Sequence, residues 1–165
     1  MILNSFKNID RFFKAKSVVF IGGKDLIVPI RELKRRGFKG KIFVVNPKRL
    51  KIENYKCLRK ISDLPLSPDA AFIAVPASEV ISTVKELKAA KCKGIVCYSA
   101  GFKETGKTGK YLEDNLIKEC GDIPLIGPNC YGFINFSDDV ALWPFSHKGG
   151  RADSPNREAL MRHLT

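Results

Sequence analysis

The sequence predicts an α/β protein: a doubly wound, mainly parallel sheet of five or slightly more strands, with helices on both faces. Five short apolar runs lack the alternation of half-exposed strands, which is typical of strands buried on both faces. Segments with helical periodicity follow most of them, and glycine or proline ends nearly every run. The five expected strands are residues 17–21, 41–45, 70–75, 94–98 and 124–126.

The first strand ends in a glycine turn. Gly22, Gly23 and Lys24 follow the β-branched run 17–21, and apolar residues then recur at helical spacing until Gly37 ends the helix. A glycine turn between a first strand and a helix is a phosphate-binding geometry. The chain has no GxGxxG motif, and two glycines after a strand are as often only a tight turn, so both interpretations stay open.

The second strand, residues 41–45, is followed directly by Asn46, Pro47, Lys48 and Arg49. NAD-binding domains usually place Asp or Glu here to hold the ribose 2′-hydroxyl. Two cations would instead attract an extra ribose phosphate, such as the 3′-phosphate of CoA or the 2′-phosphate of NADP. The alternative is an ordinary basic surface loop.

The third and fourth strands lead into small or helix-starting residues. Pro76 stops the strand 70–75, and Ser78 is the expected cap of the next helix. The strand 94–98 runs into Ser-Ala-Gly at residues 99–101, which opens space at the carboxyl end of the sheet. Ligands of open α/β sheets bind at that end.

The fifth strand, residues 124–126, ends in a rigid turn. Pro128 forbids its continuation, and Asn129 and Gly132 allow positive φ angles. Cys130 is therefore expected on a turn at the carboxyl end of a strand. The turn predicts either a ligand-facing cysteine or simply a buried one in a tight connection.

The composition limits the classes of protein to which the chain can belong. With 165 residues, 44% of them hydrophobic, the chain is expected to be one ordered domain. No apolar run is long enough for a membrane span, and the N-terminus has no signal-peptide core. Five cysteines without a CxxC motif predict reduced thiols and a cytoplasmic location.

The net charge of +12 is concentrated in the first 60 residues, which hold 17 Lys/Arg against 4 Asp/Glu. This distribution predicts an anionic partner, namely nucleotide phosphates, a nucleic acid or an acidic protein, or merely a solvated surface.

Residues 9–16 are expected to form a short amphipathic lead-in. Residues 1–147 are predicted to form the domain, and residues 148–165 to be a tail of truncated or foreign origin.

Six stretches together resemble one family, the NDP-forming acyl-CoA synthetases, which include the related succinyl-CoA synthetase alpha subunit. GPNCYGFIN is similar to that family's GPNC-x-G-x-IN signature. The other stretches are RFFKAKSVVFIGG, GFKGKIFVVNPK, the DLP at residues 63–65, DAAFIAVPA and SAGFKETG. The resemblance covers about Phe12 to His147, and it implies a Rossmann-like fold and coenzyme A as the ligand.

The resemblance also implies which residues face CoA. The loop after the first strand would face the phosphates, and the loop after the second would lie near the adenosine and its phosphate. The ends of the third and fourth strands would border the adenine or the pantetheine arm, and the last turn would lie near the thiol. The expected cofactor-binding residues are Gly22, Gly23, Lys24, Asn46, Pro47, Lys48, Val75, Pro76, Ser99, Ala100, Gly101, Asn129 and Cys130.

The chain departs from the family in two respects. Its first loop is shorter and poorer in glycine, so Lys24 is expected to replace backbone N–H donors there. The family also passes energy through a phosphohistidine on a later domain, whereas the histidines of this chain, His147 and His163, follow no second α/β domain. Cys130 has no evident base partner and is not expected to be a nucleophile.

The resemblance therefore implies the CoA-binding domain of an acid–thiol ligase, which holds CoA for thioester formation. Further ligase domains or a partner subunit, including an ATP-grasp part, would supply the phosphohistidine and the nucleotide. The chain alone is not expected to be catalytically competent, no catalytic or metal-binding residue is assigned, and assembly into a homo-oligomer is open.

Three other functions compete with this one. The chain could be a stand-alone CoA-binding module without catalysis. It could be an NADP-dependent oxidoreductase domain, which the cations after the second strand permit and the missing GxGxxG disfavours. Nucleic-acid binding ranks last, because the basic residues are not interleaved with aromatic ones in a recognisable binding motif.

Overall fold

The computed structural model of the protein describes residues 2–146, with side chains from residue 8 onward. Its strands are β1 (Ser17–Gly22), β2 (Lys41–Val45), β3 (Lys51–Ile52), β4 (Tyr55–Leu58), β5 (Ala70–Ala74), β6 (Ile95–Cys97), β7 (Leu125–Ile126), β8 (Phe133–Asn135) and β9 (Val140–Leu142). Its α-helices are α1 (Ile2–Phe13), α2 (Ile27–Arg35), α3 (Ala77–Ala89) and α4 (Lys107–Cys120). Three short 3-10 helices are η1 (Lys24–Leu26), η2 (Ile61–Asp63) and η3 (Lys103–Thr105).

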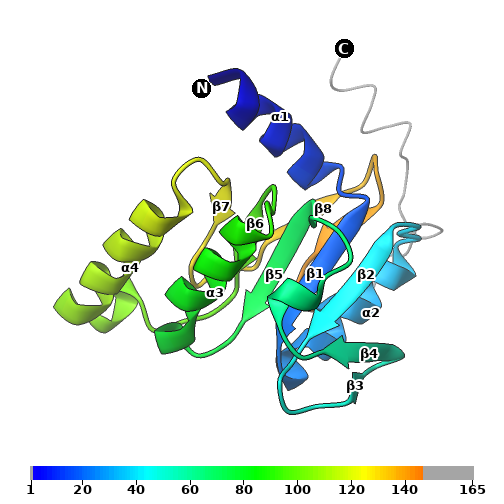
Figure 1. Ribbon diagram of the computed structural model, residues 1–165, viewed down its shortest axis with the longest axis horizontal. Helices are drawn as coiled ribbons and strands as arrows, with labels where there is room; N and C mark the ends of the chain where they lie inside the picture. Colours follow the sequence, from blue (N-terminus) through cyan, green and yellow to red (C-terminus); the bar gives the residue numbers. More distant parts are fainter. Residues whose placement is uncertain (1, 147–165) are drawn as a thin grey trace.

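The sheet has the predicted doubly wound topology. Its strand order is β3-β4-β2-β1-β5-β6-β7, and every neighbouring pair except β3–β4 is parallel (Figure 1). The chain builds outward from β1 through β2 to β4, then returns to the other side of β1 and builds outward again from β5. The order therefore reverses between β1 and β5, and this switch point is where an open α/β sheet binds its ligand.

Both faces of the sheet are buried, which explains the absence of alternation in the strand sequences. Val18 and Phe20 of β1 pack into a core with α2 and the hairpin β8–β9. Val19 and Ile21 of the same strand pack into a second core with α3 and α4. All four side chains are buried, as expected for a central strand of a parallel sheet.

Asp69 joins the start of β5 to the start of β1. Its carboxylate accepts hydrogen bonds from the backbone N–H groups of Lys16 (3.0 Å) and Ser17 (3.1 Å) and from the Ser17 hydroxyl (3.0 Å). Arg11 of α1 donates to the same carboxylate through Nε at 2.9 Å and forms an ion pair with it. Asp69 and Ser17 are buried, so this network fixes α1 and two central strands at one end of the sheet.

Several local predictions are corrected. The lead-in 9–16 overlaps the end of a 12-residue helix, α1, which begins at Ile2 and ends at Phe13. The sheet has seven strands, in agreement with the prediction of five or slightly more, because the segment after β2 adds β3 and β4. Ser78 does not cap α3, since the helix begins at Ala77 with Pro76 at the capping position and no side-chain cap. The hairpin β8–β9 was not predicted. The tail 148–165 and His147 lie outside the described residues.

Candidate functional site

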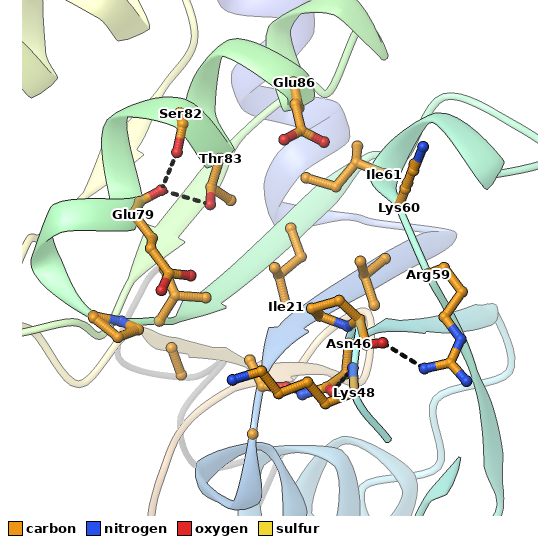
Figure 2. Close-up of a pocket in the computed structure, with 17 residues that line it drawn as sticks. Ile21, Asn46, Lys48, Arg59, Lys60, Ile61, Glu79, Ser82, Thr83 and Glu86 are labelled. Carbon is orange, nitrogen blue, oxygen red and sulfur yellow. Dashed lines mark hydrogen bonds between the residues drawn. The ribbon is translucent and has the colours of Figure 1, made fainter. Parts of the chain in front are cut away.

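A pocket of about 480 Å³ lies at the switch point, and we call it the switch-point pocket (Figure 2). The glycine turn after β1, the loops after β2 and β4, the end of β5 and one side of α3 from Glu79 to Glu86 surround it. Its lining residues are Ile21, Gly22, Gly23, Val45, Asn46, Pro47, Lys48, Arg59, Lys60, Ile61, Ala74, Val75, Pro76, Glu79, Ser82, Thr83 and Glu86. The pocket thus brings together residues from five separate segments of the sequence.

The charged side chains of this pocket are divided between two walls. Lys48, Arg59 and Lys60 line it from the loops after β2 and β4, whereas Glu79 and Glu86 line it from α3 (Figure 2). All five residues are exposed, so a ligand in the pocket can reach their side chains. A ligand with a phosphate at one side and hydrogen-bond donors at the other would match this division.

Asn46 shapes the cationic wall. Its side-chain amide donates to the carbonyl of Gly22 at 2.6 Å, and its side-chain oxygen accepts from the backbone N–H groups of Lys48 (2.9 Å) and Arg49 (2.7 Å). Arg59 donates to the carbonyl of Pro47 in the same loop. Asn46 therefore ties the end of β1 to the basic loop and acts as a positioning residue.

Gly22 lets β1 and β5 approach each other at the pocket floor. Its φ is 149°, and a Cβ at this position would overlap with the carbonyl oxygen of Ala74. Only glycine accommodates both conditions. Gly23, the next residue, has open space where a Cβ would lie, so the turn presents accessible backbone toward the pocket.

A second pocket, of about 430 Å³, adjoins the first along the carboxyl end of the sheet, and we call it the Cys130 pocket. Ala74, Val75 and Pro76 line both pockets, so the end of β5 is their common border. The remaining lining residues of the Cys130 pocket are Asp25, Tyr98, Ser99, Ala100, Asn129, Cys130 and Tyr131.

Ser99 connects the end of β6 to the border between the pockets. Its hydroxyl donates to the carbonyl of Val75 at 2.6 Å and accepts from the N–H of Val75 at 3.2 Å. The carbonyl of Ser99 in turn accepts from the N–H of Asn129 at 3.0 Å. Ser99 is buried and its hydroxyl is used by the backbone, so it holds the walls of the pocket in place.

Cys130 lies on the predicted turn. Asn129 and Gly132 have positive φ angles of 51° and 83°, as the sequence indicates. The Cys130 thiol lies 3.4 Å from the carbonyl oxygens of Cys97 and Ile126, and burial raises its pKa above the ordinary value. In the part of the chain that the structure describes, no histidine, lysine or arginine lines this pocket, so the residues around Cys130 favour a neutral thiol.

Eleven of the thirteen residues expected to bind the cofactor line one of the two pockets; Lys24 and Gly101 line neither. Lys24 is exposed at the start of η1, directly after the lining residue Gly23. Sequence reasoning missed Arg59 and Lys60. The signal for them was a basic pair directly after a short strand, much as Lys48 and Arg49 follow β2 after Asn46 and Pro47.

The sequence model of one family, described as the CoA binding domain, matches residues 28–135. The chain belongs to the CoA-binding domain family. The Rossmann-like strand order described above agrees with this assignment.

Curated relatives of this CoA-binding domain are ligases. It is 38% identical over 149 residues to acetate–CoA ligase [ADP-forming] II of Archaeoglobus fulgidus, covering 83% of this chain and 22% of that protein. It is 30% identical over 139 residues to the alpha subunit of acetate–CoA ligase [ADP-forming] II of Pyrococcus furiosus, covering 77% of this chain and 29% of that subunit. The chain is therefore homologous to ADP-forming acyl-CoA synthetases, and it spans less than a third of their length.

A solved structure shows the same fold. The apo dinucleotide-forming acetyl-coenzyme A synthetase 1 of Candidatus Korarchaeum cryptofilum superposes on the CoA-binding domain with a TM-score of 0.76 and 27% sequence identity. The match covers 84% of this chain and 31% of that protein.

Within residues 2–146, no helix has the length and apolar content needed to cross a membrane.

Proposed function

We propose that the chain binds CoA across both pockets, with the 3′-phosphoadenosine in the switch-point pocket and the thiol end in the Cys130 pocket. One observation carries the proposal: the two pockets share Ala74, Val75 and Pro76, and of the described lysines and arginines, those that line either pocket lie in the switch-point pocket and none lies in the Cys130 pocket. A long ligand with a phosphorylated nucleoside at one end and a neutral thiol arm at the other fits that arrangement. Family membership and the ligase relatives support it.

The chemistry of each wall indicates which part of CoA it would hold. Lys48, Arg59 and Lys60 would hold the 3′-phosphate, because cations bind phosphate through charge-assisted hydrogen bonds. The backbone of Gly22 and Gly23, ahead of α2, would face the diphosphate. The pantetheine arm would then cross the end of β5 past Val75 and Pro76.

We further propose that the domain holds CoA for an ADP-forming acyl-CoA synthetase. Further ligase domains or a partner subunit would supply the activated acyl group, since the chain corresponds to less than a third of its ligase relatives. One of these relatives is named as an alpha subunit, which supports assembly with a second chain.

Calorimetric titration of the chain with CoA tests the proposal, with dephospho-CoA, NADPH and ADP as comparison ligands. We expect CoA to bind most tightly, and dephospho-CoA to bind about tenfold more weakly, because it lacks the 3′-phosphate. Preference for NADPH over CoA would contradict the proposal in favour of an oxidoreductase domain. Equal affinity for CoA and dephospho-CoA would contradict the assignment of the cationic wall.

Chemical modification of Cys130 tests separately whether the thiol end of CoA lies in the Cys130 pocket. The other four cysteines are buried, whereas Cys130 is half-buried in the pocket. We therefore expect iodoacetamide to modify Cys130 first, slowly at pH 7 and faster above pH 9, because burial raises the pKa of the thiol. CoA at about ten times its Kd should slow this modification about tenfold by mass action.

Peptide mass spectrometry measures the rate at each cysteine, with buried Cys57 as the internal reference. A Cys130 rate that saturating CoA leaves unchanged would show that the thiol end lies elsewhere.

A further inference from the structure

Three aromatic side chains form a surface cluster beside the Cys130 pocket. The ring centroid of Tyr131 lies 6.1 Å from that of Trp143 and 5.0 Å from that of Phe145, and the Trp143 and Phe145 centroids are 6.1 Å apart. All three pairs have edge-to-face geometry. Tyr131 is 60% exposed and Phe145 44%, so two of the rings present apolar surface outward. We call these residues the aromatic cluster.

The local fold fixes the position of the cluster next to the pocket. Tyr131 directly follows Cys130 and lines the Cys130 pocket itself. Gly132 then presses against β9, where a Cβ would overlap with the carbonyl oxygen of Leu142, and Phe133 pairs with Leu142 across the hairpin. This close approach places Tyr131 beside Trp143, the residue after Leu142. The aromatic cluster is thus built on a rigid turn and a buried strand.

The charge of the neighbouring pocket limits what can lie there. Among residues 8–146, Asp25 is the only Asp, Glu, Lys, Arg or His that lines the Cys130 pocket. A second carboxylate entering this pocket would be repelled by Asp25, and no lysine, arginine or histidine of the described lining would offset that repulsion. An uncharged group with apolar surface would instead be stabilised by contact with the rings.

We propose that the aromatic cluster is an acyl-group subsite, which receives the acyl moiety of an acyl-CoA thioester and favours aromatic or larger apolar groups over acetyl. The inference rests on the proposed function, because it takes the CoA sulfur to lie near Cys130. The acyl carbon is bonded to that sulfur, so the acyl group would meet Tyr131, the ring of the cluster that lines the pocket. Trp143 and Phe145 pack against Tyr131 and extend its apolar surface. Succinyl groups are disfavoured there by Asp25.

Calorimetric titration of the full chain with CoA, acetyl-CoA, benzoyl-CoA and succinyl-CoA tests the subsite. We expect benzoyl-CoA to bind about tenfold more tightly than acetyl-CoA, as contact between rings predicts. Succinyl-CoA should bind more weakly than acetyl-CoA. In Tyr131→Ala the ratio of benzoyl-CoA to acetyl-CoA affinity should fall to about one.

The matched control is Tyr111→Ala, which removes an exposed tyrosine of α4 that lines neither pocket. It should keep the wild-type affinity ratio. Equal affinities of the wild-type chain for benzoyl-CoA and acetyl-CoA would overturn the subsite and leave CoA binding intact. A Tyr131→Ala variant that keeps the ratio but loses a dimer on size exclusion would also overturn it, since the cluster would then bind a second copy. Failure of all four ligands to bind would overturn the proposed function itself.

Discussion

Arg59→Ala combined with Lys60→Ala is expected to weaken CoA binding by one to two orders of magnitude, that is, by about 30-fold at low salt. Both side chains line the cationic wall of the switch-point pocket, opposite the acidic wall of α3. The affinity for dephospho-CoA should change by less than about threefold, because the lost contacts would be to the 3′-phosphate. Calorimetry with both ligands measures the two changes in one series.

The matched control is Lys51→Ala combined with Lys56→Ala. These exposed lysines lie on the neighbouring pair β3–β4, opposite each other in register, and line neither pocket. The control removes the same net charge, so it isolates contact from the long-range field of the basic half. If the two double variants weaken CoA binding equally, the effect is one of net charge, and the cationic wall does not bind the phosphate.

Asp69→Ala is expected to lower the free energy of unfolding by about 3 kcal/mol, because it leaves buried donors without partners. The carboxylate accepts from Ser17 through both its backbone N–H and its hydroxyl, and from Arg11 of α1. Urea unfolding followed by circular dichroism measures the change. Asp69→Asn, which keeps one acceptor oxygen, should lose about half as much.

An exposed aspartate provides the comparison for this variant. Asp122→Ala, in the loop before β7, should change the free energy of unfolding by less than about 0.5 kcal/mol. An Asp69→Ala protein as stable as Asp122→Ala would mean that α1 is held to the sheet by apolar contacts alone, chiefly through the buried ring of Phe12.

Most of the sheet follows from the sequence because its strands are buried on both faces. The predicted bounds of β1, β2, β5, β6 and β7 agree with the structure to within one residue at either end. Continuous β-branched runs and abrupt glycine or proline breaks mark such strands clearly. The turn at Asn129 and Gly132 was predictable for the same kind of reason, since positive φ angles restrict the residue types that fit.

The remaining parts depend on contacts that sequence patterns do not encode. β4 pairs with β2 through two residues only, Val44 with Cys57 and Val45 with Leu58, and half of its side chains are polar. A strand so short gives no periodic signal, so Arg59 and Lys60 were not placed beside Lys48. The hairpin β8–β9 was missed because its three-residue strands gain their stability by packing on the core near α2, not from local propensity.

Because β1 is a central strand, the stretch that the family model matches is smaller than the part of the chain that must fold together. The family match spans residues 28–135, and so it omits both β1 and β9. Yet β1 pairs with β2 on one side and β5 on the other, over five residue pairs each, and every residue of β9 is buried. A fragment trimmed to the matched stretch would lack β1, so β2 and β5 would have unpaired edges. It would also lack the glycine turn after β1, and the apolar face that β9 covers would be exposed. The smallest autonomous piece of this protein is therefore larger than the part by which its family is recognised.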